Sequence, residues 1–193
     1  MKLKKIKSKS DVSASDRCDG YLIEGNGFVL RHIKMSDAQK YFECEIDPIS
    51  KKNFMTTFTS IKIIKDMIRK ELSGLKKKNP EEETFVIDVD NEFAGYVVVH
   101  DLNREHAKHK AIISYCMHPK FRGRGLMVKS VKLVTKYVFK KYKLKRLTGR
   151  CRTFNKTSAR VLEKAGYKFE GIHRKEVIKD GKYLDNMYWA VVK

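Results

Sequence analysis

Residues 122–127 read Arg122-Gly123-Arg124-Gly125-Leu126-Met127, and they separate a segment typical of a strand from one typical of a long amphipathic helix. Glycines let the backbone turn tightly and bring its N–H groups close to a ligand, and a helix start adds about half a positive charge there. The stretch therefore predicts a diphosphate site at the start of a helix. Alone it is a weak signal, because such turns also serve purely structural needs.

The segments around this loop predict an α/β (α+β mixed) fold. Alternating and β-branched runs indicate about seven strands, and apolar residues at helical spacing indicate the helices between them. The expected strands are 28–33, 84–89, 93–102, 111–117, 146–152, 167–178 and 183–192; the expected helices are 38–46, 61–75, 126–142 and 155–166. Pro48 is expected to end the first helix, with a linker after it. This order predicts a mixed sheet with helices on both faces.

Length and composition predict one domain at residues 21–193 behind a flexible basic tail at residues 1–20. The chain has 193 residues, of which 41% are hydrophobic, and its first fifteen residues hold no apolar run of signal-peptide length. No segment is apolar enough for a membrane span. The four cysteines stand far apart, which predicts reduced thiols, no metal site and a cytoplasmic location: Cys18, Cys44, Cys116 and Cys151.

The net charge of +20 predicts a positive field that attracts phosphates, whether of a cofactor, of RNA or of a membrane surface. The net charge does not distinguish these partners, because much of it comes from lysines on predicted helices, where they can simply form solvent-exposed faces. The aromatic residues are not interleaved with the basic ones as a nucleobase-stacking surface requires. The loop also lacks the third glycine of the dinucleotide fingerprint, and the chain has no G-x-x-x-x-G-K-[ST] motif.

At this loop the chain resembles the GNAT acetyltransferase superfamily, whose acetyl-CoA loop has the form [RQ]-x-x-G-x-[GA]. Arg122, Gly125 and Met127 occupy the three defining positions, and Met127 departs from the pattern. Further matches look like the branch that acetylates the N-termini of ribosomal proteins, and they run in order from about residue 28 to 192: Leu30-Arg31, Ser36-Asp37-Ala38, Asn155-Lys156-Thr157-Ser158, Leu162 to Tyr167, Glu170-Gly171 and Asp180-Gly181 with Asp185. The resemblance implies a mostly antiparallel sheet, splayed where the cofactor binds.

The resemblance also implies the site residues and a direct attack of the amine on acetyl-CoA in a ternary complex. Ser158 corresponds to the hydroxyl that protonates the departing thiolate, and Glu176 lies within one residue of the carboxylate used as a base. The implied acetyl-CoA contacts are the strand end at Cys116 and Met117, the loop residues Arg122, Gly123, Arg124, Gly125, Leu126 and Met127, and Asn155.

Several alternatives remain open at this point. Asn155 and Ser158 are also common helix-capping residues, and Glu176 also fits a surface ion pair. The expected acceptor is a protein or peptide N-terminus, with a small amine such as an aminoglycoside or polyamine as the alternative. The other alternative is a catalytically impaired module that binds RNA or the ribosome. Neither a monomer nor a homodimer is favoured, and no membrane partner is expected.

Overall fold

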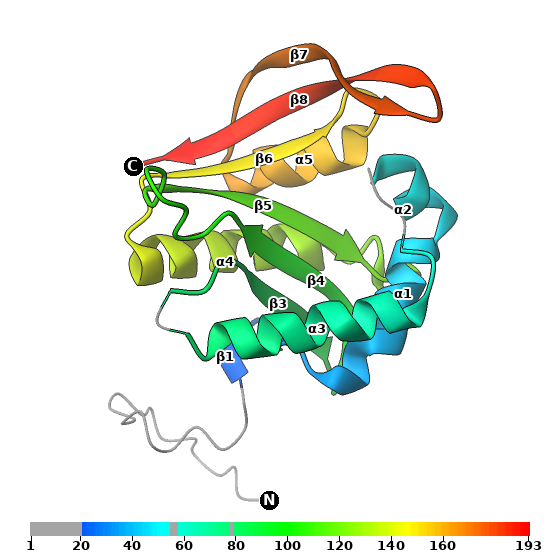
Figure 1. Cartoon of the computed structure of the whole chain (residues 1–193), viewed down its shortest axis with the longest axis vertical. Coiled ribbons are helices and arrows are strands. Elements are labelled where there is room, and N and C mark those ends of the chain that lie inside the picture. The colour runs from blue at the N-terminus through cyan, green and yellow to red at the C-terminus, as the bar shows by residue number, and fades with distance from the viewer. Residues whose placement is uncertain (1–20, 55–57, 78) are drawn as a thin grey trace, which may run out of the picture.

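The alternating hydrophobic segments form strands of one sheet in the computed structural model, which describes residues 21–54, 58–77 and 79–193 (Figure 1). Its strand order is β1-β2-β3-β4-β5-β6-β8-β7. The strands are β1 (Tyr21–Gly25), β2 (Phe28–His32), β3 (Glu83–Val89), β4 (Glu92–His100), β5 (Lys110–Met117), β6 (Arg146–Arg152), β7 (Lys168–Lys179) and β8 (Lys182–Val192). The helices are α1 (Ala38–Ile46), α2 (Pro48–Asn53), α3 (Ile61–Leu75), α4 (Leu126–Tyr142) and α5 (Lys156–Ala165), with single 3-10 turns η1 (Met35–Asp37) and η2 (Pro119–Phe121).

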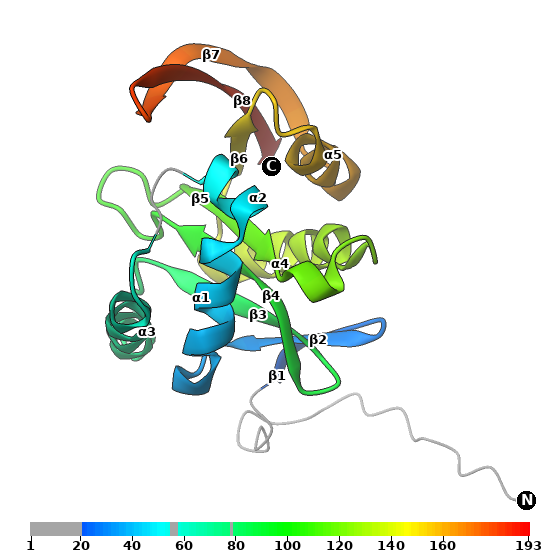
Figure 2. The same cartoon turned by 90° about the vertical axis from the view of Figure 1, so that its right-hand side faces the viewer.

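The sheet is antiparallel throughout except at one junction. β5 and β6 are parallel, and their pairing stops at Ile113 and Gly149. Beyond that point β5 stays paired with β4, and β6 stays paired with β8 to its last residue, Arg152. The two halves of the sheet therefore diverge, as Figure 2 shows from the side. This confirms the predicted mixed, mostly antiparallel and splayed sheet.

Helices cover both faces of the sheet. In Figure 1, α1 and α3 lie in front of β3 to β5, while α4 and α5 lie behind the sheet. β3 and β4 are buried along nearly their whole length, because they lie in the middle of the sheet between these layers. The hydrophobic core accordingly forms two clusters, a larger one with α4 and α5 and a smaller one with α1 and α3.

The structure differs from the expectation at the first helices and the first strand. β1 pairs with β2 ahead of the predicted first strand, so the described residues form eight strands instead of about seven. Pro48 follows the end of α1 but also begins α2, since the Asp47 side chain accepts a hydrogen bond from the Ser50 N–H. The short helix α2 therefore occupies the start of the predicted linker.

Some sequence predictions concern residues that the structure describes only in part. The predicted tail at residues 1–20, which includes Cys18, lies outside the described residues. Within them, Cys44, Cys116 and Cys151 are free thiols, and no cluster of three or more metal-ligating side chains occurs. None of the helices in this part of the chain is both long and apolar enough to cross a membrane.

A buried arginine joins the sheet to α1. Arg31 on β2 is 5% exposed; its Nε donates to Asp88 at 2.7 Å, and its Nη1 and Nη2 donate to the Asp37 carboxylate at 2.8 and 2.9 Å. Asp37 also accepts the Lys34 N–H at 2.7 Å, which secures the turn before α1. Burial opposes the charge on Arg31, but the hydrogen bonds from both carboxylates outweigh it and raise the pKa of the guanidinium.

Arg31→Ala is expected to lower the free energy of unfolding by about 3–5 kcal/mol, because it leaves two buried carboxylates without their cation. Chemical denaturation measures this loss. Arg69→Ala is the control, since it removes an exposed pair with Asp66 and should change stability by less than about 1 kcal/mol. Equal effects of the two substitutions would contradict a structural role for the Arg31 cluster.

Candidate functional site

The glycine-rich loop connects the end of β5 to the start of α4. Gly123 and Gly125 have φ angles of +79° and +71°, in the left-handed region that favours glycine. Gly125 is the N-cap of the 17-residue α4, and no side chain caps this end of the helix. The N–H groups of the first turn are thus available to an anion, and the helix dipole adds positive potential at the same place.

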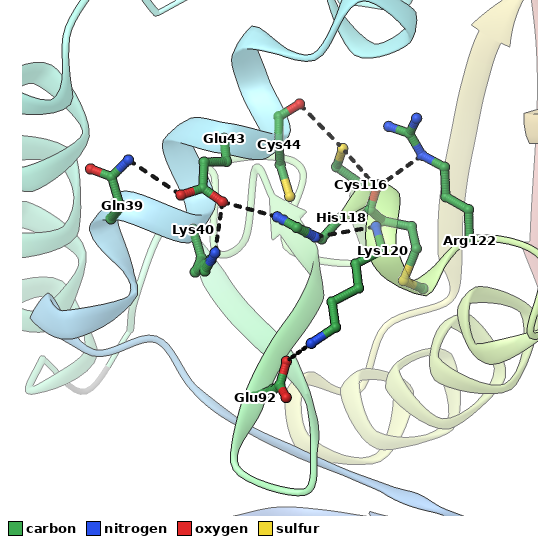
Figure 3. Close-up of polar contacts among 10 residues, drawn as sticks. Gln39, Lys40, Glu43, Cys44, Glu92, Cys116, His118, Lys120 and Arg122 are labelled. Atoms are coloured by element: carbon green, nitrogen blue, oxygen red, sulfur yellow. Dashed lines mark hydrogen bonds and ion pairs between the residues drawn. The ribbon is translucent and has the colours of Figure 1, made fainter.

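Polar contacts on the α1 side hold the loop in place (Figure 3). Nε of Arg122 donates to the Met117 carbonyl at 3.2 Å, and Nη2 donates to Asp47 at 2.6 Å. His118 lies between the loop and α1: its Nδ1 accepts the Lys120 N–H at 3.4 Å, and its Nε2 lies 3.1 Å from the Glu43 carboxylate. The loop is therefore fixed to α1 and α2 as well as to β5.

The two loop arginines have different surroundings. Burial opposes ionisation of Asp47, but its bonds from Arg122 and Ser50 outweigh that effect and hold the pKa of the carboxyl below its usual value. Arg122 is thus engaged in an ion pair that ties α2 to the loop. Arg124 is exposed, stacks over the Phe121 ring at 5.1 Å and makes a long contact to the Lys120 carbonyl. Only Arg124 presents a largely free guanidinium to solvent beside the helix start.

A cavity of about 420 Å³ runs from this loop into the gap between β5 and β6. All nine predicted acetyl-CoA contacts line it, together with Ser158. Tyr115 and Met117 reach it from the α4 and α5 side of the sheet, and Cys116 from the α1 side, so the cavity passes through the split. On that second side it is lined by α2, through Ile49 and Asn53. Residues from both faces of the sheet thus border the cavity.

The start of α5 brings a hydroxyl pair to the cavity. Asn155 is the N-cap of α5, as predicted, and its side-chain oxygen accepts the Ser158 N–H at 3.1 Å. The Ser158 hydroxyl lies 2.9 Å from the Tyr115 hydroxyl, which also donates to the Ser158 carbonyl at 3.1 Å. Burial raises the pKa of Tyr115, so this residue remains a neutral phenol at physiological pH. Ser158 and Tyr115 together form a proton-bearing group at the wall of the cavity.

Met127 and Cys116 each belong partly to the core. Met127, in the first turn of α4, is 8% exposed and packs in the larger hydrophobic cluster while it lines the cavity. Cys116 is buried in the smaller cluster, with its sulfur 3.3 Å from the Ser50 hydroxyl. The resemblance implies that acetyl-CoA contacts the strand end at Cys116 and Met117. The Met117 N–H faces the gap at the unpaired edge of β5, whereas the Cys116 N–H faces β4.

Glu176 does not line this cavity. It lies in an irregular stretch of β7 between His173 and Val177, where the pairing with β8 is interrupted. The Tyr188 hydroxyl donates to it at 2.6 Å, and His173 Nδ1 lies 3.2 Å away. These contacts lower the pKa of the Glu176 carboxyl, the bond from Tyr188 contributing most. The structure therefore separates Glu176 from the other predicted site residues.

Sequence reasoning missed two residues of this site. Tyr115 lies inside a predicted strand, and no local pattern signals its contact with Ser158, which spans 43 positions in the chain. The interpretation of Pro48 as a helix stop gives Asp47 no role. The Asp-Pro pair is itself a signal for a helix start, since aspartate is favoured at the N-cap and proline at the first helical position.

Comparisons with known proteins agree with this geometry. The family model described as Acetyltransferase (GNAT) domain matches residues 28–168. The chain is 26% identical over 179 residues to the probable N-acetyltransferase YjcK of Bacillus subtilis, covering 89% of this chain and 97% of that protein. It is 29% identical over 116 residues to the spermidine N(1)-acetyltransferase of Escherichia coli K12, covering 58% and 61%.

A solved structure shares the fold. It is RimL, described as a ribosomal L7/L12 alpha-N-protein acetyltransferase in complex with coenzyme A, and it superimposes with a TM-score of 0.76 at 17% identity. The match covers 87% of this chain and 95% of that one.

Gly125→Glu is expected to weaken acetyl-CoA binding by at least about 100-fold, because it places a carboxylate where the pyrophosphate is expected. A Cβ at Gly125 meets no atom within 4 Å, so steric clash does not explain a loss. Isothermal titration with acetyl-CoA measures the affinity.

Gly181→Glu is the matched control, because Gly181 has the same φ of +71°, is equally open and lies in the β7–β8 turn. Unchanged affinity in Gly125→Glu, or an equal loss in both variants, would assign the loop another role.

Proposed function

This chain belongs to the GNAT acetyltransferase family and is an acetyl-CoA-dependent N-acetyltransferase, and we propose that its acceptor is the N-terminal amine of a protein or peptide. The observation that carries the choice of acceptor concerns the cavity at the split, where the amine would react: none of the residues that line this cavity is acidic. A polyamine carries several positive charges and needs carboxylates around it. A neutral N-terminal amine does not need carboxylates around it.

The described residues fit acetyl-CoA. The uncapped start of α4, with Gly123 and Gly125 turning the loop, holds the pyrophosphate, and Arg124 adds a charge-assisted contact. The gap between β5 and β6, with Asn155 and the free edge of β5, would hold the pantetheine arm. Met127 packs into the core at the helix start, which leaves the two glycines to provide the close approach of the backbone.

Bound acetyl-CoA supplies the acetyl group as a thioester, and the amine attacks it directly. One backbone N–H at the free edge of β5, that of Met117, would polarise the thioester carbonyl, because the Cys116 N–H is directed toward β4. Ser158 gives a proton to the departing thiolate. Tyr115 holds the Ser158 hydroxyl in position at 2.9 Å. The acceptor enters from the α2 side of the split, opposite Ser158.

Glu176 or an ordered water takes the proton of the amine. An N-terminal amine has a pKa of about 8, against about 10.4 for lysine, so a weak acceptor suffices. Glu176 lies on β7 and accepts a hydrogen bond from Tyr188 of β8, and its lowered pKa makes it a weak base that acts through water.

A small amine is the second candidate acceptor. The similarity to the spermidine N(1)-acetyltransferase of Escherichia coli supports it, although that match covers 58% of this chain. Similarity in fold to the ribosomal-protein acetyltransferase supports the first candidate.

The proposed function predicts acetylation of peptides that begin with serine or alanine. The whole chain is incubated with acetyl-CoA and either such a peptide or spermidine, thiol release is followed, and mass spectrometry locates the acetyl group. The expected result is an acetylated N-terminus and faster thiol release with the peptide. If only spermidine is acetylated, the acceptor is a small amine and not a protein N-terminus. If no thiol is released and acetyl-CoA gives no thermal shift, the result favours a module without catalytic activity.

Ser158→Ala is expected to lower kcat by about 100-fold or more and to leave acetyl-CoA affinity within about twofold, because a general acid acts on the transition state. Steady-state kinetics and titration calorimetry separate the two effects. Ser73→Ala, an exposed serine on α3, is the control and should match the wild type. Wild-type turnover in Ser158→Ala would remove Ser158 as the acid, and Tyr115→Phe would then be the variant in which the loss appears.

The pH dependence tests Glu176 in the same assay. Glu176→Gln is expected to lower turnover most below about pH 8, where the amine is protonated and needs an acceptor, and less above it. A profile parallel to that of the wild type would leave ordered water as the only base.

A further inference from the structure

In the half of the sheet formed by β6, β8 and β7, none of the described helices packs across one of the two faces. α5 packs behind β6 and β8, where Cys151 and Met187 join the larger core. Side chains alternate along a strand, so Arg150 and Arg152 of β6 point to the opposite face, as do Asn186 and Tyr188 of β8, their partners in register. We call this surface, which carries Arg150, Arg152, Asn186 and Tyr188, the open face. It is continuous with the side of the split on which α2 lines the cavity.

Arg152 is buried on this face without an acidic partner. It is 5% exposed, and its Nη1 donates to the Asn186 side-chain oxygen at 2.6 Å. Its Nε has no hydrogen-bond partner among the described residues, and no carboxylate of that part of the chain forms an ion pair with it. A buried cation normally has both a full set of hydrogen-bond acceptors and a carboxylate partner, because removing its charge from water costs several kcal/mol.

Arg31 shows the usual arrangement in the same protein. Both arginines are 5% exposed, but Arg31 is held by two carboxylates and Arg152 by one neutral amide. The pKa of Arg31 is raised, whereas burial, with a further contribution from Arg150, lowers the pKa of Arg152. The open face therefore contains a desolvated positive charge whose counter-ion the described residues do not provide.

The Arg152 charge lies next to the split, where the acceptor is proposed to bind. Arg150 and Arg152 are the first and third residues of β6 after its last pair with β5, so both stand at the split. Arg152 occupies the same side of the sheet as Cys116, which lines the cavity across the gap. Arg150 is exposed and lines a hollow of about 650 Å³ with Thr148, His173 and Tyr188, in which four basic side chains, Arg150 among them, accompany three carboxylates, those of Asp101, Glu105 and Glu170. The hollow lies beside the paired part of β5 and β6, and Arg150 is its lining residue on β6 next to the split.

We propose that Arg152, assisted by Arg150, binds an anionic group of the acceptor: the side-chain carboxylate of an acidic residue close to the N-terminus that is acetylated. This inference rests on the proposed function and names its substrate class. A peptide fits better than a small acid, because the hollow at Arg150 continues away from the split and has room for the following residues. Guanidinium groups bind carboxylates through two parallel hydrogen bonds, and the buried Nε of Arg152 is a donor that has no partner among the described residues.

The test uses the whole chain and three C-terminally amidated peptides that differ only at position 2, which is Asp, Asn or Lys behind an N-terminal Ser. Wild-type kcat/KM is expected to be at least about tenfold higher for the Asp peptide than for the Asn peptide, as one charge-assisted hydrogen bond predicts. The Lys peptide should be the poorest acceptor. A fourth acceptor, the free dipeptide Ser-Ala, presents its carboxylate at the chain end and reports whether a small anionic acceptor is preferred instead.

Arg152→Gln keeps a polar group beside Asn186 and is expected to remove the preference for Asp over Asn. Arg150→Gln alters only an exposed side chain, and it should reduce the preference even if Arg152→Gln fails to fold. Lys140→Gln on α4 removes one exposed charge far from the split and should leave the ratio unchanged. The ratio of two peptides reports on recognition, because a general loss of structure lowers both values together.

Each possible result supports or overturns the proposal. Equal kcat/KM for the Asp and Asn peptides, or a ratio preserved in both arginine variants, would overturn the proposal while the proposed function stands. A preference for the free dipeptide over all amidated peptides would keep the anion subsite and overturn the acidic side chain as its occupant. Acetylation of spermidine with no peptide acetylated would overturn both.

Discussion

The separation of β5 from β6 beyond Ile113 and Gly149 is the constraint on which the rest of the site depends. Each strand keeps a full partner on its outer side, β4 for β5 and β8 for β6, so the inner edges can part without loss of the sheet. Gly149 contributes directly, because a Cβ there would lie 2.5 Å from a methyl carbon of Leu162, and α5 could not approach β6 so closely. Two unpaired backbone edges inside a protein require a partner, and a ligand that carries amides and a carbonyl provides one.

The loop, α2 and the last hairpin form one unit around that gap. Arg122 links the loop to Asp47, which is also the N-cap of α2, so the ion pair and the cap position the same short helix. From the other side, Lys179 of β7 donates to backbone carbonyls of Lys51 and Phe54 at the end of α2. A six-residue helix is too short to be stable alone. Its contacts with both halves of the sheet make α2 sensitive to how far the halves diverge, and α2 borders the acceptor side of the cavity.

The sequence predicted the elements whose signals are local. α4 and β6 have the expected bounds, and α5 is bounded by Asn155 and Gly166 at its caps, because glycines, N-cap residues and helical periodicity act within a few positions. Contacts between distant residues escaped it: Tyr115 meets Ser158 only because α5 packs beneath the split. The surroundings of Glu176 were equally hidden, since the bulge in β7 and the left-handed Lys175 reset which residues face Tyr188. Alternation along a strand predicts facing only while the pairing is regular.

The positive charge of the chain acts in two ways that differ in range. The net charge of +20 attracts any anion, but at physiological salt its field is screened within about 8 Å of the surface, so it raises encounter rates without distinguishing among anions. Arg152 is desolvated and fixed against Asn186, and its interaction is short-range, directional and weakly screened. Under the proposal for Arg152, a dication is repelled by both effects and an acidic peptide is attracted by both, whereas coenzyme A is attracted only by the first. The proposed selectivity at the split therefore depends on one buried guanidinium more than on the forty-three basic residues as a whole.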